Sequence, residues 1–191
     1  MQSRPNLART LCFMFSGKAG VGKTFLSDMI QKWCDEVGLK TLKSPFAYGV
    51  KETASFMGWD GNKDIRGRKL LQSIGNVGRV YDEDVWVRNT FIRIEEQVGY
   101  PFDAIFIDDW RFTNEFAYVF NQEPLYQPIT IRVSSDSREI LRGTPEYLDV
   151  SETQLDNFDF DYTIHNDVMD IDFSDCLHRM LVSEIRKNSV V

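Results

Sequence analysis

Residues 17–24 read Gly17-Lys18-Ala19-Gly20-Val21-Gly22-Lys23-Thr24, which is a complete G-x-x-x-x-G-K-[ST] motif. In loops of this kind the glycines let consecutive backbone N–H groups curl around anionic oxygens, so all eight residues are expected to form a phosphate-binding loop. Lys23 is expected to reach the β- and γ-phosphates, and the Thr24 hydroxyl to bind Mg²⁺. The motif therefore predicts a site for a nucleoside triphosphate and its magnesium ion.

The sequence on either side of the loop supplies the strand and the helix that such a loop requires. Residues 11–15 form a continuous apolar run of the buried-strand type. After the loop, apolar side chains recur at helical spacing, at Phe25, Leu26, Met29, Ile30 and Trp33. The loop is therefore predicted to join a buried strand to the N-terminus of a helix.

Strands and helices alternate along the rest of the chain. Strands are predicted at about 10–15, 40–43, 104–107, 129–133 and 162–164. Helices are predicted at about 23–37, 46–57, 114–120 and 172–186, with two more between 64 and 98 and a turn at 58–62. This alternation predicts an α/β fold with a parallel sheet covered on both faces, and a length of 191 residues suits one domain.

Composition and charge narrow the class of ligand. The net charge is −7 and the pI about 4.9, so nucleic acid polymers and anionic membrane surfaces would be repelled on average. No stretch approaches the length of a membrane-spanning segment and none resembles a signal-peptide core, which predicts a cytoplasmic protein. The cysteines and histidines are too scattered to predict disulfides or a zinc site.

The phosphate loop alone does not name the reaction, because many activities share it. The chain lacks the N-K-x-D pattern with which GTPases read their base, and Asp108-Asp109 has no adjacent glutamate of the kind that activates water in motor ATPases. Instead, isolated cations occur in several segments, at Lys51, Arg66, Arg68, Arg111, Arg138 and Arg142. On an acidic protein this distribution favours the binding of a second small molecule that carries phosphate.

Five blocks of sequence follow the phosphate loop, at residues 46–51, 68–75, 84–87, 109–111 and, near the end, 151–152 with 161–167. Their order and spacing resemble those of bacteriophage deoxynucleoside monophosphate kinases, members of the P-loop nucleoside monophosphate kinase superfamily. The resemblance implies a three-layer P-loop kinase fold with a five-stranded parallel sheet over residues 1–191, a helical acceptor-binding region at about 45–98 and a short lid at about 134–153. It also implies that ATP phosphorylates a deoxynucleoside 5′-monophosphate to the diphosphate, in the host cytoplasm.

The same resemblance implies roles for residues of the acceptor-binding region. Lys51 is similar to a lysine at the start of the acceptor-binding helix, and Arg68 to the arginine that holds the acceptor phosphate. Gln72 follows Arg68 by one helical turn, which suits either an amide that reads a nucleobase edge or an exposed helix glutamine. Trp86 is expected either to stack on the base of the acceptor or to fill the core.

Asp109 and Arg111 match the D-x-R block of the family, at the C-terminal end of a predicted parallel strand. Successive side chains of a strand point in opposite directions, so only one of Asp108 and Asp109 is expected to face the Mg²⁺. Asp109 is the predicted metal ligand because it matches the motif. Asp109 and Arg111 are also expected to line the acceptor site, and Arg111 to stabilise the transferred phosphoryl group or else to be a solvated charge.

The resemblance implies two further contacts with the nucleotides. Arg138 and Arg142 lie four residues apart and are expected to form the lid that closes over the transferring phosphoryl group, with an ordinary surface loop as the alternative. Asn166 follows the last predicted strand, where the fold brings a loop beside the adenine of ATP. A plain strand-ending turn explains Asn166 equally well.

Two other functions stay open. Residues 156–158 and 161–162, after Ser151-Glu152, also resemble the end of animal-type phosphomevalonate kinases, another group of small-molecule phosphate kinases. A non-catalytic regulator that binds ATP as a switch, without an acceptor, is the alternative from a different class. The sequence does not decide which nucleobase is accepted, or whether the chain forms a homodimer.

Overall fold

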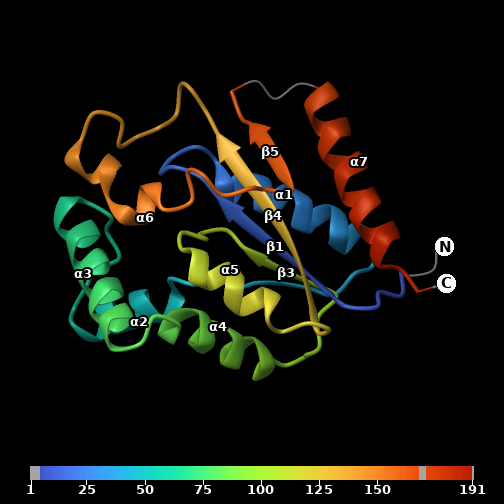
Figure 1. The fold of residues 1–191 in the computed structure, drawn as a ribbon, viewed down its shortest axis with the longest axis horizontal. Coiled ribbons are helices and arrows are strands. Elements are labelled where there is room, and N and C mark those ends of the chain that lie inside the picture. The colour runs from blue at the N-terminus through green and yellow to red at the C-terminus, as the bar shows by residue number, and fades with distance from the viewer. Residues whose placement is uncertain (1–4, 168–170, 191) are drawn as a thin grey trace.

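One parallel sheet organises the computed structural model, which describes residues 5–167 and 171–190. Every neighbouring pair of strands is parallel, and the strand order is β2-β3-β1-β4-β5 (Figure 1). The strands are β1 (Thr10–Ser16), β2 (Thr41–Lys43), β3 (Ala104–Ile107), β4 (Tyr126–Ser134) and β5 (Tyr162–His165). The predicted α/β class with a five-stranded parallel sheet is confirmed.

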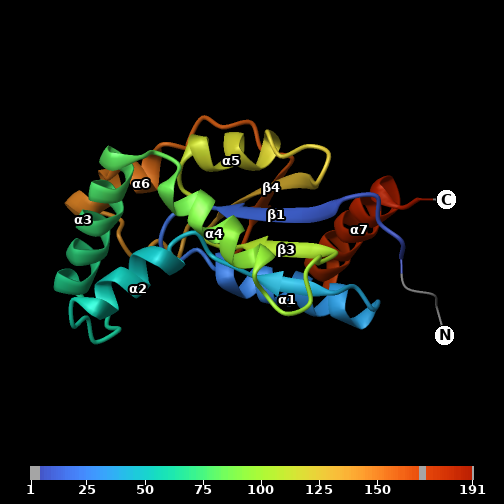
Figure 2. The ribbon, with the colours of Figure 1, turned by 90° about the horizontal axis from the view of Figure 1, so that it is seen from below.

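Helices cover both faces of this sheet and make three layers (Figure 2). On one face, α1 (Lys23–Glu36) and α7 (Ile171–Asn188) pack against Leu11, Phe13 and Phe15 of β1. On the other face, α4 (Val85–Glu95) and α5 (Thr113–Phe120) pack against Cys12 and Met14. Alternate side chains of β1 thus enter two separate cores, which explains why the strand is a continuous apolar run.

The remaining elements project beyond the carboxyl ends of the strands. On one side lie α2 (Tyr48–Phe56) and α3 (Ile65–Tyr81), and facing α3 lie the 3₁₀ helix η1 (Pro145–Leu148) and the short helix α6 (Val150–Thr153) (Figure 1). Parallel sheets bind their ligands at this edge. The phosphate loop also ends here, between β1 and α1.

The predicted elements are all present, with differences at their ends. β4 starts earlier than predicted because Tyr126 pairs with Thr10 of β1. The predicted turn at 58–62 is confirmed by Gly58 and Gly61, whose φ angles of +87° and +88° favour glycine. Neither η1 nor α6 was predicted, because helices of four residues are too short to show a periodic pattern. Over the described part of the chain, no helix is long and apolar enough to cross a membrane.

Candidate active site

The phosphate loop curls tightly between β1 and α1. Gly22 precedes α1 with a φ of 95°, in the left-handed region that other residues avoid. The Lys23 side chain folds back along the loop, and its ammonium group donates hydrogen bonds of 2.8 Å to the carbonyls of Gly17 and Lys18. Burial, and then the nearby Arg111 guanidinium, lower the pKa of Lys23 to about 7. A desolvated cation in this position is suited to an anionic ligand.

The Asn166 side chain supports the phosphate loop through a buried hydrogen bond. Its side chain is fully buried, its amide donates to the carbonyl of Val21 at 2.8 Å, and a Cβ on Gly22 would lie 2.2 Å from the amide nitrogen. The glycine is therefore required by the close approach of Asn166. An amide that is buried and already bonded to the loop leaves the predicted contact with adenine unsupported, and Asn166 instead positions the loop.

The two acidic residues after β3 point in opposite directions, as strand geometry requires. A carboxylate oxygen of Asp108 accepts a hydrogen bond from the Thr24 hydroxyl at 2.7 Å and lies 3.0 Å from the Lys43 ammonium group. The carboxylate of Asp109 instead accepts from the backbone N–H groups of Phe46 and Ala47, at 2.8 and 3.0 Å. Asp108, not the predicted Asp109, is thus the carboxylate beside the Thr24 hydroxyl.

Asp109 anchors the segment that enters α2. Burial, and then the Asp108 carboxylate, raise its pKa. Both of its oxygens already accept from backbone N–H groups. The residues that fit a magnesium ion are therefore Thr24 and Asp108, because a hydroxyl and a carboxylate beside a phosphate loop are the hard oxygen ligands that Mg²⁺ prefers.

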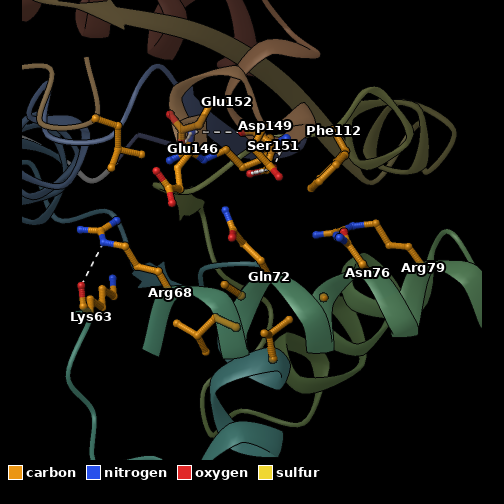
Figure 3. A pocket seen from close by; sticks show the side chains of 16 residues that line it. Lys63, Arg68, Gln72, Asn76, Arg79, Phe112, Glu146, Asp149, Ser151 and Glu152 are labelled. Carbon is orange, nitrogen blue, oxygen red and sulfur yellow. Dashed lines mark hydrogen bonds and ion pairs between the residues drawn. The ribbon is translucent and has the colours of Figure 1, made fainter. Parts of the chain in front are cut away.

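Two cavities adjoin each other above the sheet. The first, of about 380 Å³, is lined by the loop residues Ala19, Gly20, Lys23 and Thr24 together with Lys51, Asp108 and Asp109. The second, of about 210 Å³, lies between α3 and the segment of η1 and α6 (Figure 3). Lys63, Arg68 and Arg111 line both. The cations thus stand where the phosphate-loop cavity meets a second binding space.

Five of the six predicted acceptor-site residues line these cavities, among them Arg111, which lines both. Lys51 and Asp109 line the cavity of the phosphate loop, and Gln72 lines the second cavity. Arg68 lines both, and its Nε donates to the carbonyl of Lys63 at 2.9 Å. These are the sequence-predicted residues of the acceptor region that the structure brings together.

Lys63 is a cation that the sequence pattern did not indicate. Its pKa is lowered, chiefly by partial burial and then by the charges of Lys51 and Arg68. Lys63 therefore belongs to the same group of cations. It lies in the loop before α3, where no periodic pattern or family block marks it, so only its place in the fold identifies it.

Glu152 joins α6 to the phosphate loop and to Arg111. One carboxylate oxygen accepts from the backbone N–H of Ala19 at 2.9 Å, and the other lies 2.7 Å from the Arg111 guanidinium. Lys18 of the phosphate loop donates to the carbonyl of Glu152 at 2.6 Å and pairs with Asp156. The Lys18 side chain thus binds α6 and the residues after it, and Arg111 is held in place by a buried carboxylate.

Glu115 fixes the backbone that carries Arg111. Its carboxylate accepts from the N–H groups of Arg111 and Phe112, at 3.0 and 3.1 Å, at the start of α5. Burial is the main reason that the pKa of Glu115 rises to about 8 from an ordinary value of 4.5. Glu115 therefore positions the arginine that lines both cavities, at the cost of a buried carboxyl group.

This raised pKa predicts how stability depends on pH. A carboxyl group whose pKa rises on folding stabilises the folded protein fully below its unfolded pKa, and that contribution is lost as the pH rises through about 8. The free energy of unfolding should therefore fall by about 4 kcal/mol more for the wild type than for Glu115→Gln, between about pH 5 and pH 9. Urea unfolding of both proteins measures this difference. Parallel pH profiles would contradict it, and Glu123→Gln at the surface is the control.

Trp86 serves packing between helices. The indole N–H donates to the carbonyl of Gly75 at 3.0 Å, and a Cβ on Gly78 would lie 2.5 Å from the ring. The indole does not line the cavity of Gln72 and Arg68. Of the two roles predicted for Trp86, the structure supports the packing role, in which the indole holds α3 against α4.

The predicted lid arginines do not enter the two cavities. Arg138 and Arg142 are exposed, and Arg142 pairs with Glu139 at 3.2 Å. The main chain of the segment nevertheless contacts the phosphate loop, because the N–H of Ile140 donates to the carbonyl of Ala19 at 3.2 Å. The segment from Arg138 to Glu152 therefore contacts the phosphate loop through its backbone and through Glu152. The catalytic role of the two arginines stays a prediction.

Comparison with known proteins gives only distant similarities. No protein-family model matches the chain, and no curated protein matches it. Among solved structures, APE1195 is 12% identical with a TM-score of 0.45, over 95% of this chain and 98% of the other. The APS kinase CysC of Mycobacterium tuberculosis, solved as a mutant, is 10% identical with a TM-score of 0.41, over 96% and 99%. The same kinase with AMPPNP and APS is also 10% identical with a TM-score of 0.41, over 94% and 98%. Similarities at this level assign no activity to this chain.

Proposed function

We propose that the protein transfers the γ-phosphoryl group of ATP to a second small molecule that carries phosphate, and that this acceptor is a deoxynucleoside 5′-monophosphate. The observation that carries the proposal is the pair of adjoining cavities, one at the phosphate loop and one beyond it, with Lys63, Arg68 and Arg111 lining both. A protein that only hydrolyses or senses ATP has no need for a second cavity with cations at its mouth. The resemblance of the sequence blocks supports the deoxynucleotide as acceptor.

The donor side is built from the phosphate loop. Its backbone N–H groups and Lys23 would hold the phosphates of ATP, and Thr24 with Asp108 would hold Mg²⁺. When bound, the ion neutralises charge on the phosphate oxygens. Lys43 beside Asp108 keeps that carboxylate in place through its ion pair.

The acceptor side supplies cations for the incoming phosphate. Lys51, Lys63 and Arg68 would bind the acceptor phosphate, and Arg111 would stabilise the phosphoryl group between the two substrates. Phosphoryl transfer spreads negative charge over the equatorial oxygens, so fixed cations and correct positioning are the main catalytic requirements. Glu152 and Glu115 meet the second requirement because they hold the side chain and the backbone of Arg111.

The proposal is tested by incubating the protein with ATP, Mg²⁺ and a panel of acceptors. The panel contains deoxynucleoside monophosphates, ribonucleoside monophosphates and phosphomevalonate. We expect ADP to form only when a deoxynucleoside monophosphate is present. ADP formed only with phosphomevalonate would identify the protein as a phosphomevalonate kinase. ADP formed without acceptor, or no ADP at all, would contradict the kinase proposal and favour a regulator that binds ATP.

Arg68 should affect use of the acceptor more than use of ATP. In the Arg68→Met variant we expect KM for the acceptor to rise roughly tenfold or more, while the affinity for ATP changes little, because Arg68 is proposed to bind the acceptor phosphate where the second cavity meets that of the phosphate loop. Arg66→Met, an exposed cation two residues away, is the matched control and should behave as the wild type. An equal loss of ATP affinity in Arg68→Met would show that the arginine does not distinguish the two sides.

A further inference from the structure

Across the second cavity, away from the phosphate loop, an arginine faces two carboxylates, and none of the three forms an ion pair with a described residue. Gln72, Asn76 and Arg79 follow one another at helical spacing on the side of α3 that borders this cavity, and Glu146 and Asp149 approach from η1 and the start of α6 (Figure 3). A cavity with hydrogen-bond donors on one wall and carboxylates on the other suits a ligand with the complementary edges.

The Arg79 guanidinium lies over an aromatic ring and has no ion-pair partner among the described residues. Its guanidinium carbon lies 3.7 Å from the centre of the Phe112 ring, and its hydrogen bond to the side chain of Asn76 is long at 3.3 Å. Within the described residues no carboxylate oxygen lies within 4.0 Å of its nitrogens. Contact with the ring limits the positions open to the guanidinium, and its fork of N–H groups suits a planar ligand with two adjacent acceptors. Burial also lowers the pKa of Arg79, which agrees with a partly desolvated cation.

The carboxylates on the facing wall have free acceptor capacity. One oxygen of Asp149 caps α6 by accepting from the N–H and hydroxyl of Ser151, at 2.9 and 2.6 Å, and no described group donates to the other oxygen. The Glu146 carboxylate has no hydrogen bond or ion pair with any described residue. This wall can therefore accept two hydrogen bonds from a ligand.

Guanine is the nucleobase that carries both complementary edges. Its O6 and N7 are adjacent acceptors, which match an arginine fork, and its N1–H and N2 amino group are adjacent donors, which match a carboxylate. Adenine and cytosine place an amino donor next to an acceptor, and thymine has one N–H between two carbonyls. On the basis of the proposed function, we propose that the cavity selects guanine, with Arg79 reading O6 and N7 and Glu146 with Asp149 reading N1–H and the N2 amino group.

The order of residues along α3 agrees with a nucleotide bound lengthwise. Arg68, which is proposed to bind the phosphate, and Arg79, which is proposed to bind the base, are separated by roughly 16 Å of helix rise. This length leaves room for a nucleoside monophosphate between the two side chains. Gln72 and Asn76 lie between them, beside the expected positions of the sugar and the base.

Acceptor analogues test the proposal without any change to the protein. We expect dGMP to have the highest kcat/KM among dGMP, dAMP, dTMP and dCMP. Removal of the N2 amino group, in deoxyinosine monophosphate, and of N7, in 7-deaza-dGMP, should each lower kcat/KM roughly tenfold to a hundredfold. A different preferred base, or analogues used as well as dGMP, would overturn the proposal and leave the kinase function intact. If no acceptor is phosphorylated, the proposed function itself fails.

Two variants test which wall of the cavity contacts which edge of guanine. Arg79→Met should lower turnover of dGMP and should no longer distinguish 7-deaza-dGMP from dGMP, while it still discriminates against deoxyinosine monophosphate. Glu146→Gln should weaken discrimination against deoxyinosine monophosphate and preserve that against 7-deaza-dGMP. Lys69→Met, an exposed cation on α3 outside the cavity, is the matched control. If both discriminations survive in Arg79→Met and in Glu146→Gln, these walls do not read the base.

Discussion

We expect the Lys23→Met variant to lose roughly a hundredfold to a thousandfold in turnover with every acceptor. The Lys23 ammonium group lies within the phosphate loop, on the carbonyls of Gly17 and Lys18, where it would meet the charge that develops on the transferred phosphoryl group. Burial already lowers the pKa of this group to about 7, so removing the charge should not destabilise the fold. The expected result is therefore an inactive protein with an unchanged or higher free energy of unfolding.

Steady-state kinetics and urea unfolding of the same preparation measure both effects. Lys32→Met is the matched control, because Lys32 lies on the same helix with 75% of its side chain exposed and should show wild-type kinetics. A Lys23→Met variant with wild-type turnover would contradict the role of the loop as the donor site. A variant that is inactive only because it is unfolded would be recognised from the urea curve.

The second large effect concerns the choice between the two adjacent acidic residues. Asp108→Asn should lower turnover about a hundredfold and raise the Mg²⁺ concentration needed for half-maximal activity, because the carboxylate beside the Thr24 hydroxyl would be lost. Asp109→Asn should instead lower the free energy of unfolding by about 1–3 kcal/mol, because an amide can accept with only one oxygen from the N–H groups of Phe46 and Ala47.

Mg²⁺ titrations and urea unfolding of the two variants separate these outcomes. Each variant is the control for the other, because the substitutions are identical and the positions adjacent. If Asp109→Asn shifted the Mg²⁺ dependence and Asp108→Asn did not, the motif-based assignment of Asp109 to the metal would be correct and the assignment of Asp108 would fall.

The parts of the fold with a strong local signal were predictable from the sequence. The phosphate loop is one continuous motif, β1 is a continuous apolar run, and α1 has apolar residues at helical spacing. These local patterns, and similar ones along the chain, were enough to predict the order of strands and helices. The alternation rule predicted that Asp108 and Asp109 point in opposite directions. It could not say which one faces Thr24, because that depends on how β3 is placed beside β1 in three dimensions.

Residues that act through long-range contacts were not predictable in the same way. Glu152 is 133 residues from Ala19 in sequence, and its role exists only because α6 folds over the phosphate loop. Trp86 is compatible with a base-stacking or a packing role until Gly78 is found against its ring. Lys63 and Arg79 become candidates only when the walls of the second cavity are known.

The central claim is that a phosphoryl group passes from a donor at the phosphate loop to an acceptor in the adjoining cavity. Its most direct test supplies ATP labelled in the γ-phosphate, Mg²⁺ and dGMP beside the other deoxynucleoside monophosphates, and follows the label. We predict that the label appears in a deoxynucleoside diphosphate in amounts equal to the ADP formed. Label found only as inorganic phosphate, or retained in ATP with every acceptor, would contradict the claim.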